Sequence, residues 1–272
     1  ETAPHLSRDA LAYSNTAYRF WQDDTGSIWC TTRDGLYCFD PKTGRATPCR
    51  PADFDPRDAE FRQTYSLLPD GDLLWMGGWS SGLQCYNRKT GAWEQYFFNM
   101  DYGKSGVTNI VDHIAHKNAE EIWIASKDRG LGIFNKKTKR FSFPAHDPDA
   151  NPALPKTDVG IFCIDRQGQL WLDVNDQLAR IQFKQVLFRF NPVHSKIPIP
   201  KYQAPVSALF EDRENRFLFI GLNTGDGLHI FDKSTGRTIM PDFPAPPDQL
   251  REDLRSVRNI RQGPDGTIWV LS

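Results

Sequence analysis

The sequence predicts an all-β protein, and three observations lead to that prediction. An aromatic motif recurs six times, with anchor residues 46 to 50 positions apart in a chain of 272 residues. The longest apolar stretches span five or six residues, which suits strands, and no stretch has the spacing of an amphipathic helix. The 20 glycines and 19 prolines suit short strands joined by turns. Four short strands in each period are typical of a β-propeller blade.

The repeated motif defines the organisation of the chain. Each copy is anchored on a large aromatic residue in its second strand, and these anchors are Trp29, Trp75, Trp123, Trp171, Phe219 and Trp269. Because the copies cover nearly the whole sequence, we expect residues 1–272 to form a single β-propeller domain or a part of one. About six repeats of ~48 residues are present, which would be part of a larger propeller, seven-bladed or tandem.

The first copy shows the order of strands and turns within a blade. Strands are expected at Ala17–Gln22, Ile28–Thr31 and Leu36–Phe39, and the segment Asp40–Gly44 turns into a fourth strand. A Gly-Leu pair begins the third strand, and its glycine can supply the positive φ of a tight hairpin turn. The pair recurs at Gly35, Gly82, Gly130 and Gly227. Copy four departs from this pattern, since Gln177 replaces the glycine, and we expect looser or longer outer hairpins there.

The aromatic anchors and the cysteines are interpreted as core residues. A large aromatic at the same point of every second strand would pack between neighbouring blades. Cys38 and Cys85 occupy the position of Ile133 and Ile230 in the other copies, which indicates the same packing. The five cysteines contain no CxxC pair and are odd in number, which argues against a disulfide framework and a structural zinc site. No cofactor or metal is expected.

The two ends of the chain bear on blade closure. Copy six stops after its second strand, at residues 269–272, and the segment around His5 and Leu6 resembles the outermost strand of a last blade. We therefore expect a fragment or trimmed domain of a longer protein, with an exposed edge at its last strand. The sequence begins with Glu1 and not Met, and we expect any export signal to have been removed from it.

Charge and hydropathy exclude two classes of partner. Thirty-three basic and 34 acidic residues give a net charge of -1, and no basic stripe is present to neutralise a phosphate backbone. No apolar run approaches the roughly 18 to 20 residues of a membrane-spanning helix. We expect no nucleic-acid partner, and membrane contact only through segments absent from this sequence.

A search for catalytic chemistry finds no convincing constellation. His113 and His116 are three apart, which on a strand places their rings on opposite faces and disfavours joint metal binding. The other histidines are scattered singly, and no glycine-rich phosphate loop precedes a helix. The densest cationic cluster, residues 136–140, lies on a hairpin turn and is interpreted as a solvated face. We therefore expect no enzymatic activity and no catalytic residues in this domain.

The motif itself resembles a known family. The pattern acid-x-Gly-x-Leu/Ile-Trp, followed by Gly-Leu-x-φ-Phe/Tyr-Asp/Asn-x-x-Thr-Gly, with φ an apolar residue, is similar to the two-component regulator propeller repeat. That repeat occurs in periplasmic sensor regions of bacterial hybrid two-component systems. Copies one, two, three and five match it well, and copies four and six match in part. Streptogramin-lyase-like propellers share single motifs of this kind.

The resemblance implies a function and a location. In the family, propellers and an immunoglobulin-like module precede a transmembrane helix and a histidine kinase. The phosphotransfer chemistry would then lie outside these residues. The domain would sit in the periplasm and bind an oligosaccharide or another small polar ligand, and it could form a homodimer through the full-length receptor. A protein-interaction platform and a propeller-fold lyase or hydrolase remain alternatives, because one propeller scaffold serves many functions.

The candidate ligand-binding residues lie in loops at one end of the blades. Trp79 breaks the repeat by placing a tryptophan in a turn where no core slot requires one. It could stack on a sugar, or it could pack against the neighbouring 99–109 loop. The other candidates are cationic, amide and aromatic side chains that suit an acidic or hydroxylated glycan. They are Arg33, Lys127, Arg129, Asn175 and Asn223 in turns, and Tyr102, His146 and Tyr202 in the connections.

Overall fold

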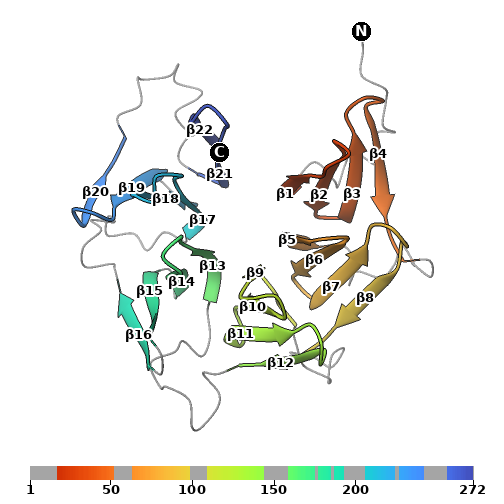
Figure 1. Ribbon diagram of the computed structural model, residues 1–272, viewed down its shortest axis with the longest axis horizontal. Helices are drawn as coiled ribbons and strands as arrows, with labels where there is room; N and C mark the ends of the chain where they lie inside the picture. The colour runs from red at the N-terminus through yellow and green to blue at the C-terminus, as the bar shows by residue number, and fades with distance from the viewer. Residues whose placement is uncertain are drawn as a thin grey trace. The chain divides into compact units, whose positions relative to one another are not determined.

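The computed structural model describes most of the chain as strands joined by short turns. The described residues are 17–51, 63–98, 109–143, 159–174, 177–184, 187–192, 206–223, 227–241 and 256–271. Within these ranges every regular element is a β-strand (Figure 1). No helix among them has the length and hydrophobicity that crossing a membrane requires. The chain divides into two compact units, and each is described by itself.

Unit 1 comprises residues 1–128 and 132–142 and carries three four-stranded antiparallel sheets, to which residues 129–131 of unit 2 also contribute. Blade 1 consists of β1 (Ala17–Gln22), β2 (Ile28–Thr32), β3 (Gly35–Asp40) and β4 (Arg45–Cys49). Blade 2 consists of β5 (Thr64–Asp70), β6 (Leu73–Gly78), β7 (Leu83–Asn87) and β8 (Trp93–Tyr96). Blade 3 consists of β9 (His113–His116), β10 (Glu121–Ser126), β11 (Gly130–Asn135) and β12 (Arg140–Ser142).

Unit 2 comprises residues 129–131 and 143–272. Blade 4 consists of β13 (Val159–Ile164), β14 (Leu170–Val174), β15 (Gln177–Lys184) and β16 (Leu187–Pro192). Blade 5 consists of β17 (Val206–Glu211), β18 (Phe217–Leu222), β19 (Leu228–Asp232) and β20 (Arg237–Ile239). A two-stranded sheet follows, formed by β21 (Asn259–Gln262) and β22 (Ile268–Leu271).

The meander of four antiparallel strands confirms the propeller blade that the repeat predicts. In every four-stranded sheet the spatial order follows the chain order, so that each strand pairs with the next one. The expected number of blades needs correction, because the described residues form five complete blades and the sixth copy contributes only two strands. The outer hairpin of blade 4 is longer than the others, with eight residues in β15. The proposed closing strand around His5 lies outside the described residues.

The turns and first strands show two features that recur from blade to blade. Positive φ angles of 106°, 62°, 73° and 60° at Gly35, Gly82, Gly130 and Gly227 confirm the predicted role of the Gly-Leu pair. A register shift also interrupts the pairing of the first strand in blades 1, 2, 4 and 5, at Tyr18, at Tyr65, between Val159 and Phe162, and at Ser207. Such bulges re-aim side chains, and in many proteins they border functional sites.

The aromatic anchors pack between blades, as the repeat predicts. Trp29, Trp75, Trp123, Trp171 and Phe219 are buried. The clusters around Trp29, Trp75, Trp171 and Phe219 combine residues of consecutive sheets. Trp75 contacts Phe134 of blade 3 with ring centroids 5.5 Å apart. The sixth anchor differs, because Trp269 is 66% exposed. The following blade covers Trp29, Trp75 and Trp171, and the described residues include no strand after β22 that could cover Trp269.

A carboxylate, an indole and a cation meet at the first boundary between blades. Asp23 follows β1 and accepts a hydrogen bond from Trp29 Nε1 at 2.8 Å and one from Arg88 Nη1 of blade 2 at 3.1 Å. Burial alone would raise the pKa of Asp23, but hydrogen bonds from Thr25, Trp29 and Ser27 outweigh burial and hold that pKa at about 2. The carboxylate is therefore charged near neutral pH and ties two blades together.

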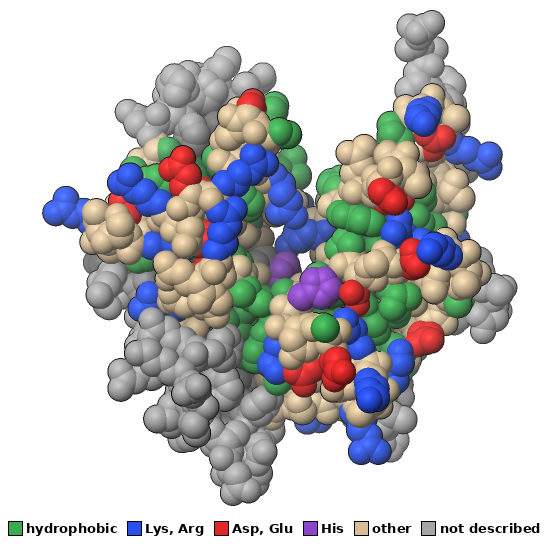
Figure 2. Space-filling model, viewed as in Figure 1, with side chains coloured by type: hydrophobic (Ala, Val, Ile, Leu, Met, Phe, Trp, Pro, Cys, Tyr) green, Lys and Arg blue, Asp and Glu red, His purple; other side chains and the backbone are tan. Residues whose placement is uncertain are grey.

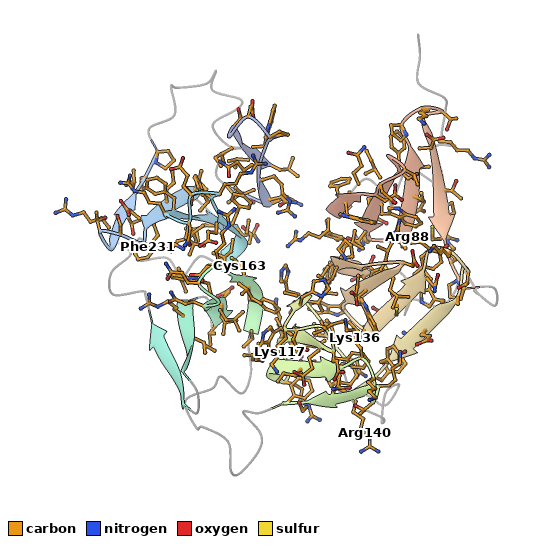
Figure 3. All side chains as sticks on the ribbon, viewed as in Figure 1. Arg88, Lys117, Lys136, Arg140, Cys163 and Phe231 are labelled. Carbon is orange, nitrogen blue, oxygen red and sulfur yellow. The ribbon has the colours of Figure 1, made fainter. Side chains whose placement is uncertain are left out.

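The same arrangement recurs at the next boundary, where it corrects the interpretation of residues 136–140 as a solvated face. Asp70 accepts hydrogen bonds from Trp75 Nε1 at 3.4 Å and from Lys136 Nζ of blade 3 at 2.7 Å. Figure 3 marks Arg88 and Lys136, the equivalent cations of blades 2 and 3, and Arg140, which points away from the sheets. Only part of this cationic cluster is therefore solvated.

Lys139 occupies a backbone position that favours glycine. Its φ of +58° is left-handed, and the equivalent turns of blades 1, 2 and 5 have Gly44, Gly91 and Gly236. Its Nζ lies 3.2 Å from a Glu94 carboxylate oxygen and 5.0 Å from the Tyr96 ring centroid. These contacts offset part of the strain of the turn.

We expect Lys139→Gly to be more stable than Lys139→Ala by about 1 kcal/mol, because both remove the cation and only glycine relieves the left-handed strain. Urea unfolding of the two variants measures the difference. Gly44→Ala is the reverse control, since an added Cβ there meets no atom within 4 Å and only the φ of +67° opposes it. Equal stability of the two Lys139 variants would mean that the turn carries no such strain.

The cysteines are free thiols inside the blades. No disulfide joins Cys30, Cys38, Cys49, Cys85 and Cys163. Burial raises the pKa of Cys30 and Cys49 to about 11 and that of Cys85 and Cys163 to about 12. Because the thiolate is the reactive form, these side chains resist oxidation even in an oxidising compartment.

Candidate functional site

The candidate site in unit 1 is built on the turns between the second and third strands. These turns follow β2, β6 and β10 and carry Arg33, Trp79 and Lys127, and all three side chains are exposed. The Trp79 side chain is 45% exposed, which is unusual for a tryptophan in a turn whose backbone is closely packed. The turns therefore present a cation, an aromatic ring and a second cation to solvent within one unit.

Two glycines fix the backbone that carries Trp79. A Cβ added at Gly77 would lie 2.4 Å from Val111 Cγ1, and one at Gly78 would lie 1.8 Å from the Gln63 carbonyl oxygen. The Trp79 amide donates to that same carbonyl at 3.3 Å, and the Val111 amide donates to the Gly78 carbonyl at 3.0 Å. Only residues without a side chain permit this close approach. The indole thus projects from a turn that is held on both sides.

Trp79 and Lys127 are brought together by blades 2 and 3. Lys127 Nζ lies 5.9 Å from the centroid of the Trp79 ring, within the range of a cation–π contact. The interaction orients the ammonium beside an exposed aromatic face. A ligand that reaches this face meets an apolar surface and a positive charge at once. The alternative, in which Trp79 packs against the 99–109 loop, stays untested, because residues 99–108 lie outside the described residues.

Two tyrosines that the sequence analysis did not single out lie beside this site. Tyr18 and Tyr65 are the bulge residues of β1 and β5, and their rings meet edge to face with centroids 4.8 Å apart. The Tyr65 hydroxyl donates to Gln63 Oε1 at 2.7 Å, and the backbone carbonyl of Gln63 accepts from Trp79. The tyrosine pair and the tryptophan turn are therefore linked through one residue.

The electrostatics of Tyr65 place Arg33 and Asp112 in the same neighbourhood. Burial, aided by Tyr18 and by the negative charge of Asp112, raises the pKa of Tyr65 to about 12, while Arg33 opposes that rise. The phenol consequently stays protonated near neutral pH and acts as a hydrogen-bond donor. The residue five positions before the turn that joins the first and second strands is polar in all three blades of unit 1. It is Tyr18 in blade 1, Tyr65 in blade 2 and Asp112 in blade 3. That shared repeat position is the signal that could have identified them.

The remaining candidates do not join this group. The Arg129 guanidinium lies 6.0 Å from the Phe143 ring centroid, and Asn223 Oδ1 accepts a hydrogen bond from Ser256 Oγ at 3.0 Å. Both belong to unit 2. Tyr102, His146, Asn175 and Tyr202 lie outside the described residues.

Metal chemistry finds no support in the part of the chain that the structure describes. No group of three or more His, Cys, Asp or Glu side chains there could hold a metal ion. A ring nitrogen of His116, Nε2, lies 3.0 Å from the Pro69 carbonyl oxygen, so this histidine joins β9 to β5. Figure 2 shows Lys, Arg, Asp and Glu side chains on the visible face of the described residues.

Solved structures of extracellular receptor domains share the fold. The chain matches the extracellular domain of a proposed one-component system from B. thetaiotaomicron with a TM-score of 0.67 and 16% identity, covering 96% of this chain and 38% of that one. For a proposed hybrid two-component system of the same organism the TM-score is 0.59 and the identity 18%, with 95% and 39% covered. The chain therefore spans less than two-fifths of either protein.

An enzyme also shares the fold. A streptogramin B lyase structure matches with a TM-score of 0.63 and 16% identity, over 95% of this chain and 76% of the lyase. At these identities the comparisons establish the β-propeller fold alone. No protein-family model matches the chain. No curated protein matches its sequence.

Proposed function

We propose that this chain is the ligand-sensing part of an extracytoplasmic two-component receptor, with the kinase carried by other segments of the full-length protein. The repeat motif supports the proposal, and so does the fold that the chain shares with extracellular receptor domains. Receptor activation needs only a difference in ligand affinity between two signalling states. Turnover is not required of such a domain.

The ligand in this proposal is a carbohydrate that carries an acidic group. The observation that carries it is the exposed Trp79 ring beside the Lys127 ammonium, on a turn held by two close-packed glycines. An indole face packs against the apolar C–H face of a sugar ring, and an ammonium attracts a carboxylate or sulfate. Arg33 adds donors in the same unit, whereas the Tyr65 hydroxyl already donates its one hydrogen to Gln63 Oε1. Backbone hydrogen bonds hold the Trp79 turn in the structure, which lowers the ordering cost that opposes binding.

We expect Trp79→Ala to weaken ligand binding by about 1 to 3 kcal/mol, on the scale of a single aromatic anchor at an interface, and to leave the melting temperature nearly unchanged. Isothermal titration with neutral, carboxylated and sulfated oligosaccharides measures the first effect, and thermal unfolding measures the second. Trp123→Ala is the opposite control, because this buried indole should matter for stability rather than for binding.

Two results would contradict this proposal in different ways. If Trp79→Ala lowers the melting temperature as much as Trp123→Ala does, the Trp79 side chain is part of the core and the site is misplaced. If the purified chain converts a bound saccharide to product, the chain is an enzyme, as the fold it shares with the lyase allows. Lys127→Met should weaken only the binding of acidic saccharides, because it removes the charge and keeps the apolar stem.

A further inference from the structure

The boundary between blades 1 and 2 contains polar side chains that the proposed function does not use. Both blades belong to unit 1. Their facing surfaces meet at Trp29 and Tyr86, whose ring centroids lie 5.9 Å apart. Side chains two residues apart on a strand share a face, so the strand register shows which other residues enter this boundary.

Thr31 enters the boundary from blade 1. It lies two residues after Trp29 on β2 and pairs with Leu36, whose side chain belongs to the apolar cluster between the two blades. The residue is 0% exposed, and its Oγ1 has no hydrogen-bond partner among the described residues. Blade 1 therefore directs a buried, unpartnered hydroxyl toward blade 2.

Gln84 enters the same boundary from blade 2. It lies two residues before Tyr86 on β7 and pairs with Met76, which belongs to the same cluster as Leu36. Its side chain is also 0% exposed, and in the described part of the chain neither Oε1 nor Nε2 has a hydrogen-bond partner. A buried primary amide that makes no hydrogen bond carries a large desolvation penalty.

The register brings the hydroxyl and the amide to one place in the boundary. Thr31 and Gln84 each lie one step along their strand from the Trp29–Tyr86 contact, and their direct strand partners pack in one cluster. No direct hydrogen bond joins the two side chains. Two polar groups that face each other beyond hydrogen-bond distance are typical of a contact through water.

A third buried hydroxyl lies on the same side of blade 2. Gly78 follows Met76 by two residues on β6 and shares its face, and a Cβ added at Gly78 would overlap Ser81 Oγ. Ser81 is 1% exposed, and its Oγ has no hydrogen-bond partner within the described ranges. Because Ser81 lies two residues after Trp79, the unpartnered polar side chains begin at the turn that carries the exposed indole.

Neighbouring hydroxyls have partners in the protein. Thr64 Oγ1 of β5 donates to the Thr32 carbonyl oxygen across the boundary at 3.3 Å, and Thr32 Oγ1 donates to the Gly35 carbonyl oxygen at 3.0 Å. These threonines are therefore satisfied without any further molecule. The unpartnered set is confined to the side chains that face each other one step farther into the boundary.

The repeat provides an internal comparison. At the boundary of blades 2 and 3 the positions equivalent to Thr31 and Gln84 are Gly77 and Gly132, which have no side chains. Val111 occupies that space, since a Cβ added at Gly77 would overlap Val111 Cγ1. Unit 1 thus fills one boundary with an apolar side chain and lines the other with polar ones.

We propose that the boundary of blades 1 and 2 binds an internal water molecule, held between the Thr31 hydroxyl and the Gln84 amide. Water donates and accepts at once, so it can satisfy both groups together. Internal waters make about three hydrogen bonds, and the Ser81 hydroxyl offers a third partner on the same side of blade 2. The water joins two blades behind the Trp79 turn, and this role requires no saccharide.

The proposal fixes the sign of two substitutions. Gln84→Met removes the amide and Thr31→Val removes the hydroxyl, and both keep the side chain close to its original size. If a water bridges the two groups, each substitution removes hydrogen bonds that the folded state makes, and stability falls. If the amide had no partner at all, Gln84→Met would remove a buried polar group that makes no bond, and stability would rise.

Thermal unfolding of the whole 272-residue chain provides the test. We expect each single variant to lower the melting temperature by at least about 2 °C, and the double variant to lower it by less than the sum, because both side chains bind the same water. Gln22→Met, which changes an exposed glutamine, should shift it by about 1 °C or less. A melting temperature that is unchanged or raised in either single variant, or effects that add in the double variant, overturns the proposal.

Nuclear magnetic resonance of the wild type keeps the proposal testable if a variant does not fold. The side-chain amide protons of Gln84, assigned through their own backbone, should show a cross-peak to water with the sign of a long-lived bound molecule. The exposed Gln22 amide is the control, and its contacts with water should have the opposite sign, which is typical of fast-exchanging surface water. A Gln84 amide without the long-lived cross-peak overturns the proposal.

Discussion

Trp75→Ala is expected to cost about 3 to 5 kcal/mol of unfolding free energy, because it empties a slot between two blades. The indole is 1% exposed and contacts Phe134 and Tyr96, with ring centroids 5.5 and 6.1 Å away. Its removal also takes a hydrogen-bond donor from Asp70. Urea unfolding followed by tryptophan fluorescence and by circular dichroism measures the loss.

The chain provides a matched control for this substitution. Trp269 occupies the same repeat position but is 66% exposed, so Trp269→Ala should change the unfolding free energy by no more than about 0.5 kcal/mol. The two variants differ in burial and not in residue type. A loss below 1 kcal/mol for Trp75→Ala would mean that the blades can close over the empty slot, and the inter-blade role of the anchors would be wrong.

The fold was predictable from sequence because its strongest signals are local and periodic. An aromatic anchor every 46 to 50 residues, followed in four copies by a Gly-Leu pair, specifies a hairpin that repeats. The left-handed φ at Gly35 and its equivalents shows that each glycine is required by its own turn. The sequence also showed that copy six stops after its second strand, as the two-stranded sheet confirms, and the number of complete blades differs from the count of repeats for that reason.

The contacts between blades were not predictable in the same way. Asp23 and Arg88 are 65 positions apart, and neither is unusual in its local context. Lys136 lies in a run of charged residues that suggests a solvated turn, yet it bonds to Asp70 of the preceding blade. Only the stacking of blades gives these residues their partners, and a single motif contains no information about its neighbour.

The candidate site was predictable in part. Trp79 was identified because it breaks the repeat, and the structure places Lys127 beside it. Tyr18 and Tyr65 were missed because an aromatic residue in a first strand looks like ordinary strand composition. Their importance depends on the bulge that turns them out of the regular pairing, and a bulge is set by the register of two strands.

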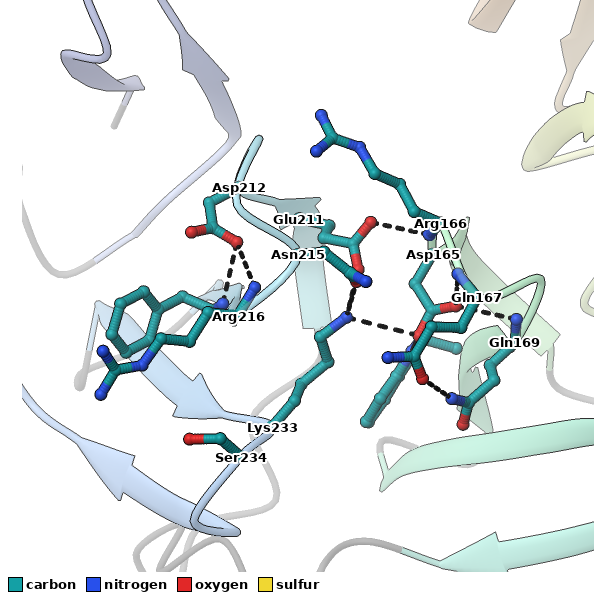
Figure 4. Close-up of polar contacts among 12 residues, drawn as sticks. Asp165, Arg166, Gln167, Gln169, Glu211, Asp212, Asn215, Arg216, Lys233 and Ser234 are labelled. Carbon is teal, nitrogen blue, oxygen red and sulfur yellow. Dashed lines mark hydrogen bonds and ion pairs between the residues drawn. The ribbon is translucent and has the colours of Figure 1, made fainter.

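The ionic cluster of blades 4 and 5 leads to the second large expected effect. Lys233 lies just after β19, where Figure 4 shows its polar contacts. Its side chain is 10% exposed. Its Nζ lies 3.6 Å from Asp165 Oδ2, donates to Asn215 Oδ1 at 2.5 Å, and forms an ion pair with Glu211. Asp165 in turn accepts the Trp171 indole hydrogen at 2.9 Å. One cation thus neutralises two buried carboxylates from two blades.

Lys233→Met is expected to cost about 3 to 5 kcal/mol, because it leaves both carboxylates buried without their cation while keeping most of the apolar stem. Lys233→Arg should retain most of the stability, since Arg88 fills the equivalent position in blade 2. Lys137→Met, which changes an exposed lysine in the corresponding turn of blade 3, should have an effect within about 0.5 kcal/mol. Urea unfolding of the three variants at neutral pH provides the comparison. If Lys233→Met is as mild as Lys137→Met, water reaches the two carboxylates and the cation does not hold the blades together.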